Sequence, residues 1–248
     1  MYQDAITRFL NKHGHQNIKL KSVLFDMDGV LFNSMPYHAN AWHKVMERHG
    51  LHLSREEAYL HEGRTGAATI NIVYQRQFQK EATQEMIQAI YDEKTIEFNK
   101  NPKPERMPGA WEVLQKVKAN GLQPMVVTGS GQEALLGRLT QNFPGMFRRE
   151  FMVTAFDVKY GKPNPEPYLM ALQKGSLQAN EAIVIENAPM GVQAGAAAGI
   201  FTIAVNTGPI DDQMLLDAGA DVLYPSMQAF CDNWEDLYGK LQMALNQA

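Results

Sequence analysis

The sequence predicts an α/β fold in which a doubly wound, Rossmann-like parallel sheet carries an inserted all-helical domain. Short apolar runs without polar alternation recur along the chain, as expected of strands that are buried on both faces of a parallel sheet. Amphipathic helical patterns separate most of these runs. One long stretch, residues 36–105, has helical patterns and no clear strand pattern, which predicts a second domain.

The predicted strands end at polar residues. We expect strands at 23–25, 125–127, 183–185, 201–205 and 221–224. The first three are followed by Asp26, Thr128 and Glu186. Because ligands bind outside the carboxyl ends of parallel strands, these side chains should face one site. Polar residues also follow strands simply because loops are exposed to solvent. An acid, a hydroxyl and a second acid at three strand ends nevertheless favour a functional site.

Helical patterns fill the gaps between the strands. We expect core helices at 110–120, 132–142, 165–174 and 189–198. Pro165 and Pro189 stand near helix starts, as the fixed φ of proline favours. Ile6, Phe9 and Leu10 lie at helical spacing and predict a short N-terminal helix that packs on the body of the protein, with a contact to another subunit as the alternative.

The strand-free stretch predicts four further helices, at 37–49, 55–61, 67–78 and 83–99, and the proline-containing segment 101–104 closes it as a stiff link. This insert lies between the first strand and the first core helix, so it should cover the carboxyl ends of the strands. We therefore divide the chain into a core, residues 1–35 and 106–248, and a helical cap domain, residues 36–105.

Composition excludes several classes of protein. The 248 residues carry a formal net charge of -4 and a pI near 6.0, which argues against nucleic acid or an anionic membrane as partner. The single cysteine, Cys231, excludes a disulfide framework and a cysteine-built zinc site. No apolar run approaches the roughly 18 residues of a membrane span, and residues 1–22 lack a secretory apolar segment, so we expect a cytoplasmic protein.

Asp26 and Asp28 follow the first strand directly, in a turn loosened by Gly29. The side chains of two acids at this spacing can point into the same small site. One could then attack phosphorus as a nucleophile, while the other transfers the proton of the leaving group. A calcium loop is the alternative, but it needs a carboxylate near its twelfth position, where this chain has Tyr37 and His38. The sequence therefore favours a catalytic pair.

Four segments, in order, resemble the motifs of the haloacid dehalogenase superfamily of phosphohydrolases. They are residues 23–31, residues 126–130, Lys162 within 160–165, and residues 185–191. The helical insert is similar in position to the cap of the β-phosphoglucomutase-like branch, and the resemblance extends over residues 21–224. An acid at Asp28 is typical of the phosphotransferring members and not of the dehalogenases.

The resemblance implies roles for the residues at the strand ends. Asp26 would be the nucleophile that forms an aspartyl-phosphate. Asp28 would be the general acid and then the base, and it would be a better acid if its surroundings raised its pKa. Thr128, with the backbone N–H groups of Gly129 and Ser130, would hold phosphoryl oxygens.

The resemblance also implies a magnesium site. Mg2+ would bind Asp26, the backbone carbonyl of Asp28, Glu186 and Asn187, because such oxygen-rich sites suit this ion and offset the charge of a transferring phosphoryl group. Lys162 would offset negative charge on the nucleophile and the phosphate.

Two residues depart from the pattern of the superfamily. Asn187 stands where an aspartate is usual, so one negative charge is missing from the metal site. Glu62 lies in the cap loop that should face an anionic substrate, where a bare carboxylate is repulsive. We expect Glu62 to bind the same Mg2+ and to replace the charge lost at Asn187. The alternative is that Glu62 pairs with Arg64 or faces solvent.

A metal-bound Glu62 would leave little space between cap and core, which favours a substrate smaller than a sugar phosphate. We expect inorganic pyrophosphate, with its distal phosphate bound by His61, Arg64, Thr65 and Lys162, and the cap-loop segment is similar to that of the inorganic pyrophosphatase members of the branch. The alternative is a sugar-phosphate phosphatase or a β-phosphoglucomutase. A non-catalytic phosphate-binding or interaction protein is a remote alternative, since the predicted nucleophile and acid are both present.

Overall fold

The computed structural model describes residues 2–131 and 135–243. In these residues the chain forms a six-stranded parallel sheet in the order β3-β2-β1-β4-β5-β6. The strands are β1 (Ser22–Phe25), β2 (Gln123–Val127), β3 (Met152–Val153), β4 (Ala182–Glu186), β5 (Phe201–Val205) and β6 (Val222–Tyr224). The predicted doubly wound parallel sheet is confirmed, with β1 at its centre.

The edge strand β3 was not predicted. It has only two residues, Met152 and Val153, so the sequence carries no apolar run long enough to indicate it. The predicted strand at 221–224 begins one residue later, at Val222. Asp221 instead accepts a hydrogen bond from the backbone N–H of Thr202 at 2.8 Å, which joins β5 to the start of β6.

Helices cover both faces of the sheet. One face carries α1 (Tyr2–His13), α6 (Ala110–Ala119), α7 (Leu135–Asn142), α11 (Met227–Asp232) and α12 (Trp234–Met243). The other carries α8 (Glu166–Gly175), α9 (Pro189–Ala197) and α10 (Asp212–Asp217). The start of the predicted helix 132–142 lies outside the described residues, and α10, α11 and α12 were not predicted.

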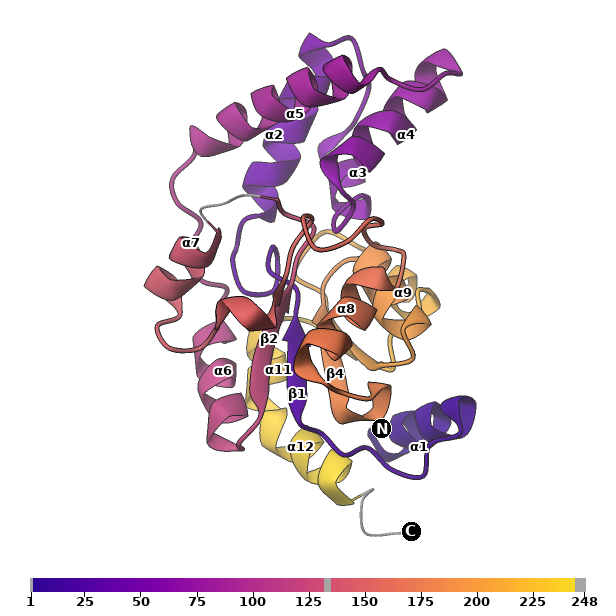
Figure 1. Ribbon diagram of the computed structural model, residues 1–248, viewed down its shortest axis with the longest axis vertical. Helices are drawn as coiled ribbons and strands as arrows, with labels where there is room; N and C mark the ends of the chain where they lie inside the picture. The colour runs from indigo at the N-terminus through magenta and orange to yellow at the C-terminus, as the bar shows by residue number, and fades with distance from the viewer. Residues whose placement is uncertain (1, 132–134, 244–248) are drawn as a thin grey trace.

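The predicted N-terminal helix packs on the core. Ile6 and Phe9 of α1 are buried, and the Phe9 ring lies edge-on to that of Phe201 with 5.4 Å between ring centroids. This helix lies at the end of the molecule opposite α2–α5 (Figure 1). No helix in the described part of the chain is both long and apolar enough to cross a membrane.

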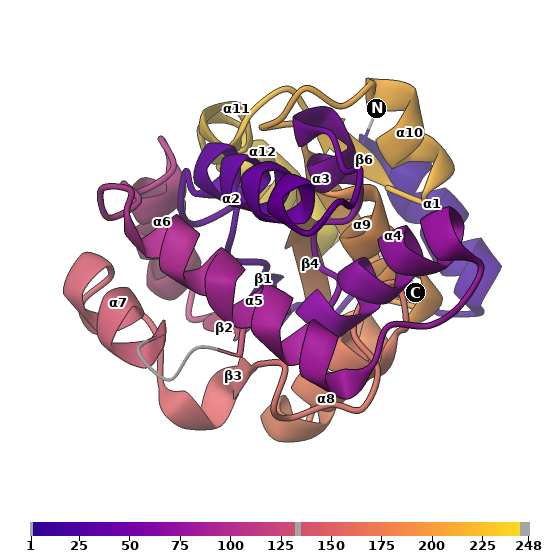
Figure 2. The ribbon, with the colours of Figure 1, turned by 90° about the horizontal axis from the view of Figure 1, so that it is seen from above.

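The helical insert lies over the carboxyl ends of the strands (Figures 1 and 2). It consists of α2 (Met35–Arg48), α3 (Arg55–Leu60), α4 (Gly66–Phe78) and α5 (Gln84–Asn99), which share an apolar cluster of their own. Ser54, Thr65 and Thr83 cap the last three helices, since each side-chain oxygen accepts an N–H three residues later. The four predicted helices are therefore present, and each end lies within two residues of its predicted position.

The loop between α3 and α4, residues 61–65, packs closely on the core. Gly63 has a φ of +83°, and a Cβ there would lie 2.9 Å from Cδ of Lys162. A Cβ at Gly129 would lie 2.9 Å from the carbonyl oxygen of Gly63. Glycines thus allow the backbones of cap and core to approach, and the cap loop closes over the end of the sheet.

Candidate active site

A buried lysine connects the two acids at the ends of β1 and β4. Lys162 Nζ donates to Asp26 Oδ1 at 2.5 Å, to Glu186 Oε1 at 2.6 Å and to the carbonyl oxygen of Val127 at 3.0 Å. All three charged side chains are almost fully buried. The carboxyl ends of β1, β2 and β4 are therefore held together by one ammonium group.

The charge of Asp26 depends on this contact. Burial raises the pKa of the Asp26 carboxyl, the Lys162 ammonium opposes the rise and Glu186 adds to it, so that the pKa lies at about 8. Burial alone would lower the pKa of Lys162, but the two carboxylates raise it. Lys162 is therefore charged at neutral pH, and additional positive charge near Asp26 would favour its ionised form.

The side chain of Asp28 contacts residues of the cap and of the segment that leads into it. Ser34 Oγ donates to Asp28 Oδ1 at 2.5 Å, and His38 Nε2 lies 3.2 Å from the same oxygen. Lys94 Nζ, from α5, lies 2.8 Å from the other ring nitrogen of His38. Burial by itself would raise the pKa of Asp28, but His38, Ser34 and Lys94 together lower it to about 2. The surroundings therefore do not raise this pKa, which was the condition for Asp28 to be a better acid, since the cap surrounds Asp28 with donors and positive charge.

Sequence reasoning did not predict Ser34, His38 and Lys94, the three residues around Asp28, as site residues. His38 and Lys94 are 56 positions apart and belong to no motif in the sequence. Lys94 is only 6% exposed, and burial lowers its pKa to about 8. A lysine on the apolar face of a predicted helix was the one signal that could have indicated it.

Thr128 lies at the end of β2. It is buried, and its Oγ1 accepts the backbone N–H of Ser130 at 3.1 Å. Together with Gly129 these residues line a cavity of about 80 Å³ between cap and core, to which Asp26 and Asp28 also contribute. The predicted phosphoryl-binding turn therefore lies beside the predicted nucleophile.

Glu62 of the cap loop reaches the core. Its Oε2 accepts a hydrogen bond from Asn187 Nδ2 at 3.0 Å, and both side chains are buried. Glu62 thus neither faces solvent nor takes Arg64 as its partner in the described contacts. Burial raises the pKa of Glu62 well above its usual value, and the charges of Asp26 and Glu186 add to this effect.

Two oxygens at this contact lack a hydrogen-bond partner among the described residues. Glu62 Oε1 and Asn187 Oδ1 are buried and unpaired, which is costly unless a cation or water binds them. No three His, Cys, Asp or Glu side chains within residues 2–131 and 135–243 converge as a metal-binding group. A site here would need the Asn187 amide oxygen and a backbone carbonyl as well, and this oxygen-only donor set is of the kind that suits Mg2+.

The residues expected to bind a distal phosphate divide into two groups. His61 and Arg64 line the inner cavity, and His61 Nδ1 and Arg64 Nε are buried without a partner in the described part of the chain. Thr65 and Lys162 instead line an outer groove. Thr65 Oγ1 accepts the Ala68 N–H at 3.2 Å, and Lys162 Nζ is occupied by its three partners. The structure therefore brings only His61 and Arg64 to the inner cavity.

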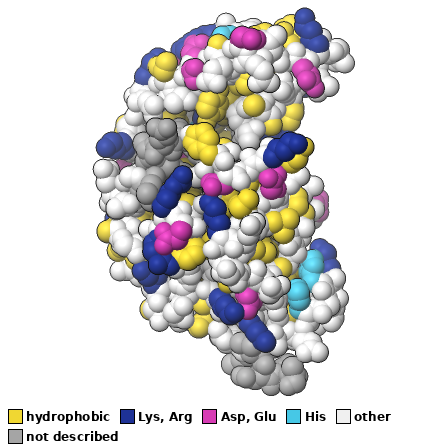
Figure 3. Space-filling view, in the orientation of Figure 1, with side chains coloured by type: hydrophobic (Ala, Val, Ile, Leu, Met, Phe, Trp, Pro, Cys, Tyr) yellow, Lys and Arg dark blue, Asp and Glu magenta, His cyan; other side chains and the backbone are white. Residues whose placement is uncertain are grey.

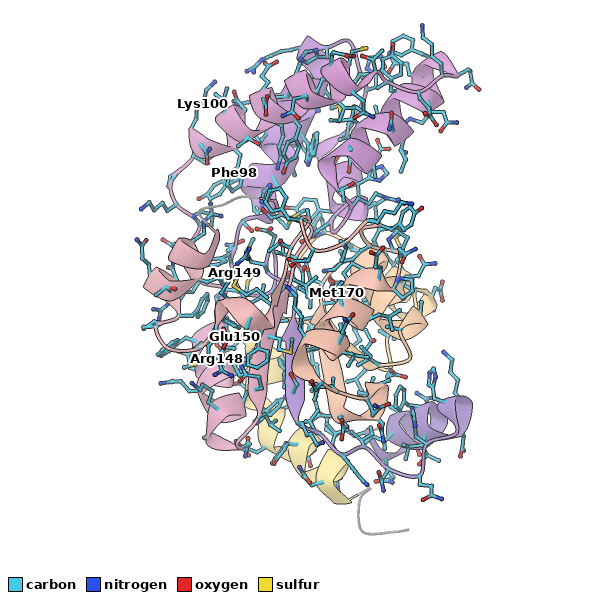
Figure 4. The ribbon with its side chains drawn as sticks, viewed as in Figure 1. Phe98, Lys100, Arg148, Arg149, Glu150 and Met170 are labelled. Atoms are coloured by element: carbon cyan, nitrogen blue, oxygen red, sulfur yellow. The ribbon has the colours of Figure 1, made fainter. Side chains whose placement is uncertain are left out.

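The surface outside the site is of mixed charge. On the face shown in Figure 3, Lys and Arg side chains are scattered among Asp and Glu side chains. Phe98 and Lys100 lie at the end of α5 that leads into the linker to the core, and Arg148, Arg149 and Glu150 lie on the core (Figure 4).

Comparison with known proteins agrees with this geometry. A family model described as a haloacid dehalogenase-like hydrolase matches residues 23–205. Hexitol phosphatase A of Escherichia coli (strain K12) is 33% identical over 199 residues, which are 80% of this chain and 88% of that protein. A phosphorylated carbohydrates phosphatase of Thermotoga maritima is 30% identical over 209 residues, which are 82% of this chain and 94% of that protein.

Solved structures show the same fold. A protein of Bacteroides vulgatus, described provisionally as a beta-phosphoglucomutase, is 65% identical with a TM-score of 0.94, over 99% of this chain and 98% of that one. The beta-phosphoglucomutase of Clostridium difficile is 20% identical with a TM-score of 0.76, over 92% and 100% of the two chains, and this likeness concerns the fold alone. The protein is therefore a hydrolase of the phosphatase type, and its chain belongs to the haloacid dehalogenase-like hydrolase family.

Proposed function

We propose that the protein is a Mg2+-dependent phosphohydrolase that works through an aspartyl-phosphate on Asp26, and that its substrate is inorganic pyrophosphate. The observation that carries the substrate proposal is the buried contact between Glu62 and Asn187. This contact brings the Glu62 carboxylate of the cap to Asn187, where the core lacks an acidic side chain. It also joins the cap to the core above a small cavity.

The residues at the strand ends support the first step. Lys162 binds Asp26 Oδ1 and so orients the carboxylate for attack on phosphorus. Thr128, Gly129 and Ser130 line the cavity beside it, and in this proposal the Thr128 hydroxyl and the N–H groups of this turn bind the phosphoryl oxygens. The side chains of Asp26, Glu186, Asn187 and Glu62 and the carbonyl of Asp28 would hold Mg2+, which when bound supplies positive charge against the phosphoryl oxygens.

The charge of Asp28 bears on the leaving group. With a pKa of about 2, Asp28 is a carboxylate at neutral pH, so it is a proton acceptor, of low basicity, for the water that hydrolyses the aspartyl-phosphate. It is a poor proton donor in the preceding step. A phosphate leaving group can depart without being protonated by Asp28, because it is a far weaker base than the alkoxide that leaves from a sugar phosphate. The environment of Asp28 therefore favours pyrophosphate.

The size of the cavity favours the same substrate. Its volume of about 80 Å³ is small beside the roughly 300 to 1,000 Å³ that is typical of pockets for drug-sized ligands. His61 and Arg64 lie on its cap side, where a second phosphate would need positive charge or N–H donors. A sugar phosphate would require the cap to stand further from the core.

A sugar-phosphate phosphatase or β-phosphoglucomutase is the second candidate function. The names of the E. coli, T. maritima and B. vulgatus proteins all refer to sugar or polyol phosphates, and none refers to pyrophosphate. The comparisons therefore favour this candidate, whereas the closed cap and the charge of Asp28 favour pyrophosphate.

We also propose that residues 1–35 and 106–248 form the catalytic domain and that residues 36–105 form the cap domain. The separate apolar cluster of α2–α5 supports this division.

The test is the initial rate of phosphate release with Mg2+ from pyrophosphate, hexitol phosphates, a hexose 6-phosphate and β-glucose 1-phosphate. We expect kcat/KM for pyrophosphate to be at least tenfold higher, which is about 1.4 kcal/mol of transition-state stabilisation. Asp26→Asn, purified in the same way, controls for a contaminating phosphatase and should be inactive. A preference for a sugar or hexitol phosphate would overturn the pyrophosphate proposal and leave the phosphohydrolase proposal standing.

A further inference from the structure

The hydroxyl group of Tyr168 contacts Glu186, one of the acids of the candidate site. Tyr168 belongs to α8, the helix that Met170 marks in Figure 4, and its side chain is fully buried. Its OH donates to Glu186 Oε1 at 2.7 Å. The Lys162 ammonium lies 5.2 Å from the centre of its ring. Tyr168 therefore contacts two of the charged groups of the site without lining the inner cavity.

The two oxygens of Glu186 have different surroundings. Oε1 accepts from both Tyr168 and Lys162. The backbone of α9 lies close to both oxygens, since a Cβ at Gly191 would lie 1.8 Å from Oε1 and 2.3 Å from Oε2. The two side-chain donors are therefore what distinguishes Oε1. Oε2 accepts the backbone N–H of Asn187 at 3.1 Å, its one hydrogen-bond partner in the described part of the chain. A carboxylate oxygen can accept more than one bond, so Oε2 keeps free acceptor capacity.

We propose that Tyr168 is a positioning residue for a divalent cation, because its hydroxyl holds Glu186 in the orientation that offers Oε2 to the ion. This proposal rests on the proposed Mg2+-dependent function. A neutral hydroxyl binds Oε1 without neutralising the negative charge of Glu186. A second lysine at this position would neutralise that charge. Without it, Lys162 is the only side-chain donor left on Oε1 in the described contacts, and the carboxylate can turn toward it.

A role in packing alone is the competing explanation. The ring of Tyr168 lies in the apolar cluster that includes Leu24, Val184 and Ala171, and a phenylalanine would fill the same space. The hydroxyl is the part that packing does not need, since a buried hydroxyl costs free energy unless it is bonded. Tyr168→Phe therefore separates the two explanations.

Tyr224→Phe is the matched control. Tyr224 is also buried, and its OH donates to the OH of Tyr2 at 2.9 Å, between the edge strand β6 and helix α1. This variant loses a partly buried hydroxyl hydrogen bond outside the candidate site.

The experiment is calorimetric titration of substrate-free wild type, Tyr168→Phe and Tyr224→Phe with Mg2+. Partners that orient metal ligands are typically worth about 10- to 100-fold in affinity. We expect Kd to rise at least tenfold in Tyr168→Phe and to change less than twofold in Tyr224→Phe. In turnover, the Mg2+ concentration for half-maximal rate should rise in parallel, with kcat at saturating Mg2+ within about threefold of wild type.

An unchanged Kd in Tyr168→Phe would overturn the proposal and leave the proposed function intact. Failure of the wild type to bind Mg2+ would instead overturn the proposed function. Should Tyr168→Phe not fold, Tyr168→His keeps a ring and an N–H donor and is the second variant. We expect Tyr168→His to bind Mg2+ more tightly than Tyr168→Leu, and equal affinities of these two would contradict the role of the donor.

Discussion

Asn187 of the core donates its side-chain N–H to Glu62 of the cap at 3.0 Å, and each of the two groups keeps a buried oxygen without a partner in the described part of the chain. This contact joins the two residues by which the sequence departs from the motifs it resembles. Replacing the contact tests both the metal site and the closure of the cap.

Glu62→Gln should abolish Mg2+-dependent turnover. The substitution keeps the size of the side chain and an acceptor for Asn187, but it removes the negative charge that we propose for the metal. We expect kcat/KM to fall at least 100-fold with unchanged thermal stability in the absence of Mg2+. The control is Glu56→Gln on the exposed side of α3. Turnover within a few-fold of wild type would rule out the metal role of Glu62.

Asn187→Asp should make the closed cap depend on a cation. The new carboxylate would lie where Asn187 now donates to Glu62, so two negative charges would face each other at hydrogen-bonding distance in a buried place. We expect a lower melting temperature than wild type without Mg2+ and a larger increase on adding Mg2+. Scanning fluorimetry with and without Mg2+ measures this. An equal Mg2+-induced increase in both proteins would contradict the prediction.

The core acids of the site were predictable because each follows a strand. Asp26 and Glu186 end apolar runs, and parallel strands bring their carboxyl ends together whatever the details of packing. Lys162 was predicted from the resemblance alone. The structure shows that its ammonium is occupied by the core acids, which no local pattern could reveal.

The cap side of the site was predictable only in part. The position of the insert placed the loop with Glu62 over the site, because the insert interrupts the chain at a strand end. The contact of Asp28 with His38, and that of His38 with Lys94, depend instead on how α2 and α5 pack, and this packing joins residues that are far apart in the sequence. Strand β3 was missed for the opposite reason, since two residues carry no periodicity.

Gly29→Ala should destabilise the protein. Gly29 has a φ of +80°, and a Cβ there would lie 2.0 Å from Nδ2 of Asn187. Left-handed strain costs about 1 to 2 kcal/mol and overpacking about 1 to 3 kcal/mol, so we expect a loss of roughly 2 to 5 kcal/mol in the free energy of unfolding. In Gly137→Ala, where nothing lies within 4 Å of the new Cβ, helix α7 should gain about 0.5 to 1 kcal/mol. Urea denaturation of both variants measures the difference, and equal stabilities would be inconsistent with it.

Metal-free protein should lose stability as the pH rises toward 8. The pKa of Asp26 is raised to about 8 in the folded state from its usual 3.8, so between these values the folded state holds a proton that the unfolded state has released. Stability then falls with rising pH, by at most about 1.4 kcal/mol per pH unit for this one group. Asp26→Asn should flatten the dependence between pH 5 and 8. Melting curves in EDTA measure it, and identical slopes in the two proteins would show that Asp26 does not titrate there.

Lys94→Met should move the acidic limb of the pH–rate profile to higher pH. The variant keeps the length and apolar body of the side chain, and it removes the ammonium that lies behind His38 and helps to lower the pKa of Asp28. Asp28 would then lose its proton at higher pH, so the rate at about pH 3 to 4 should fall more than the rate at pH 8. Lys44→Met is the control, because Lys44 lies on the cap and pairs with Glu97 rather than with His38. If Lys94 instead binds the substrate, KM rises by the same factor at every pH and the limb stays in place.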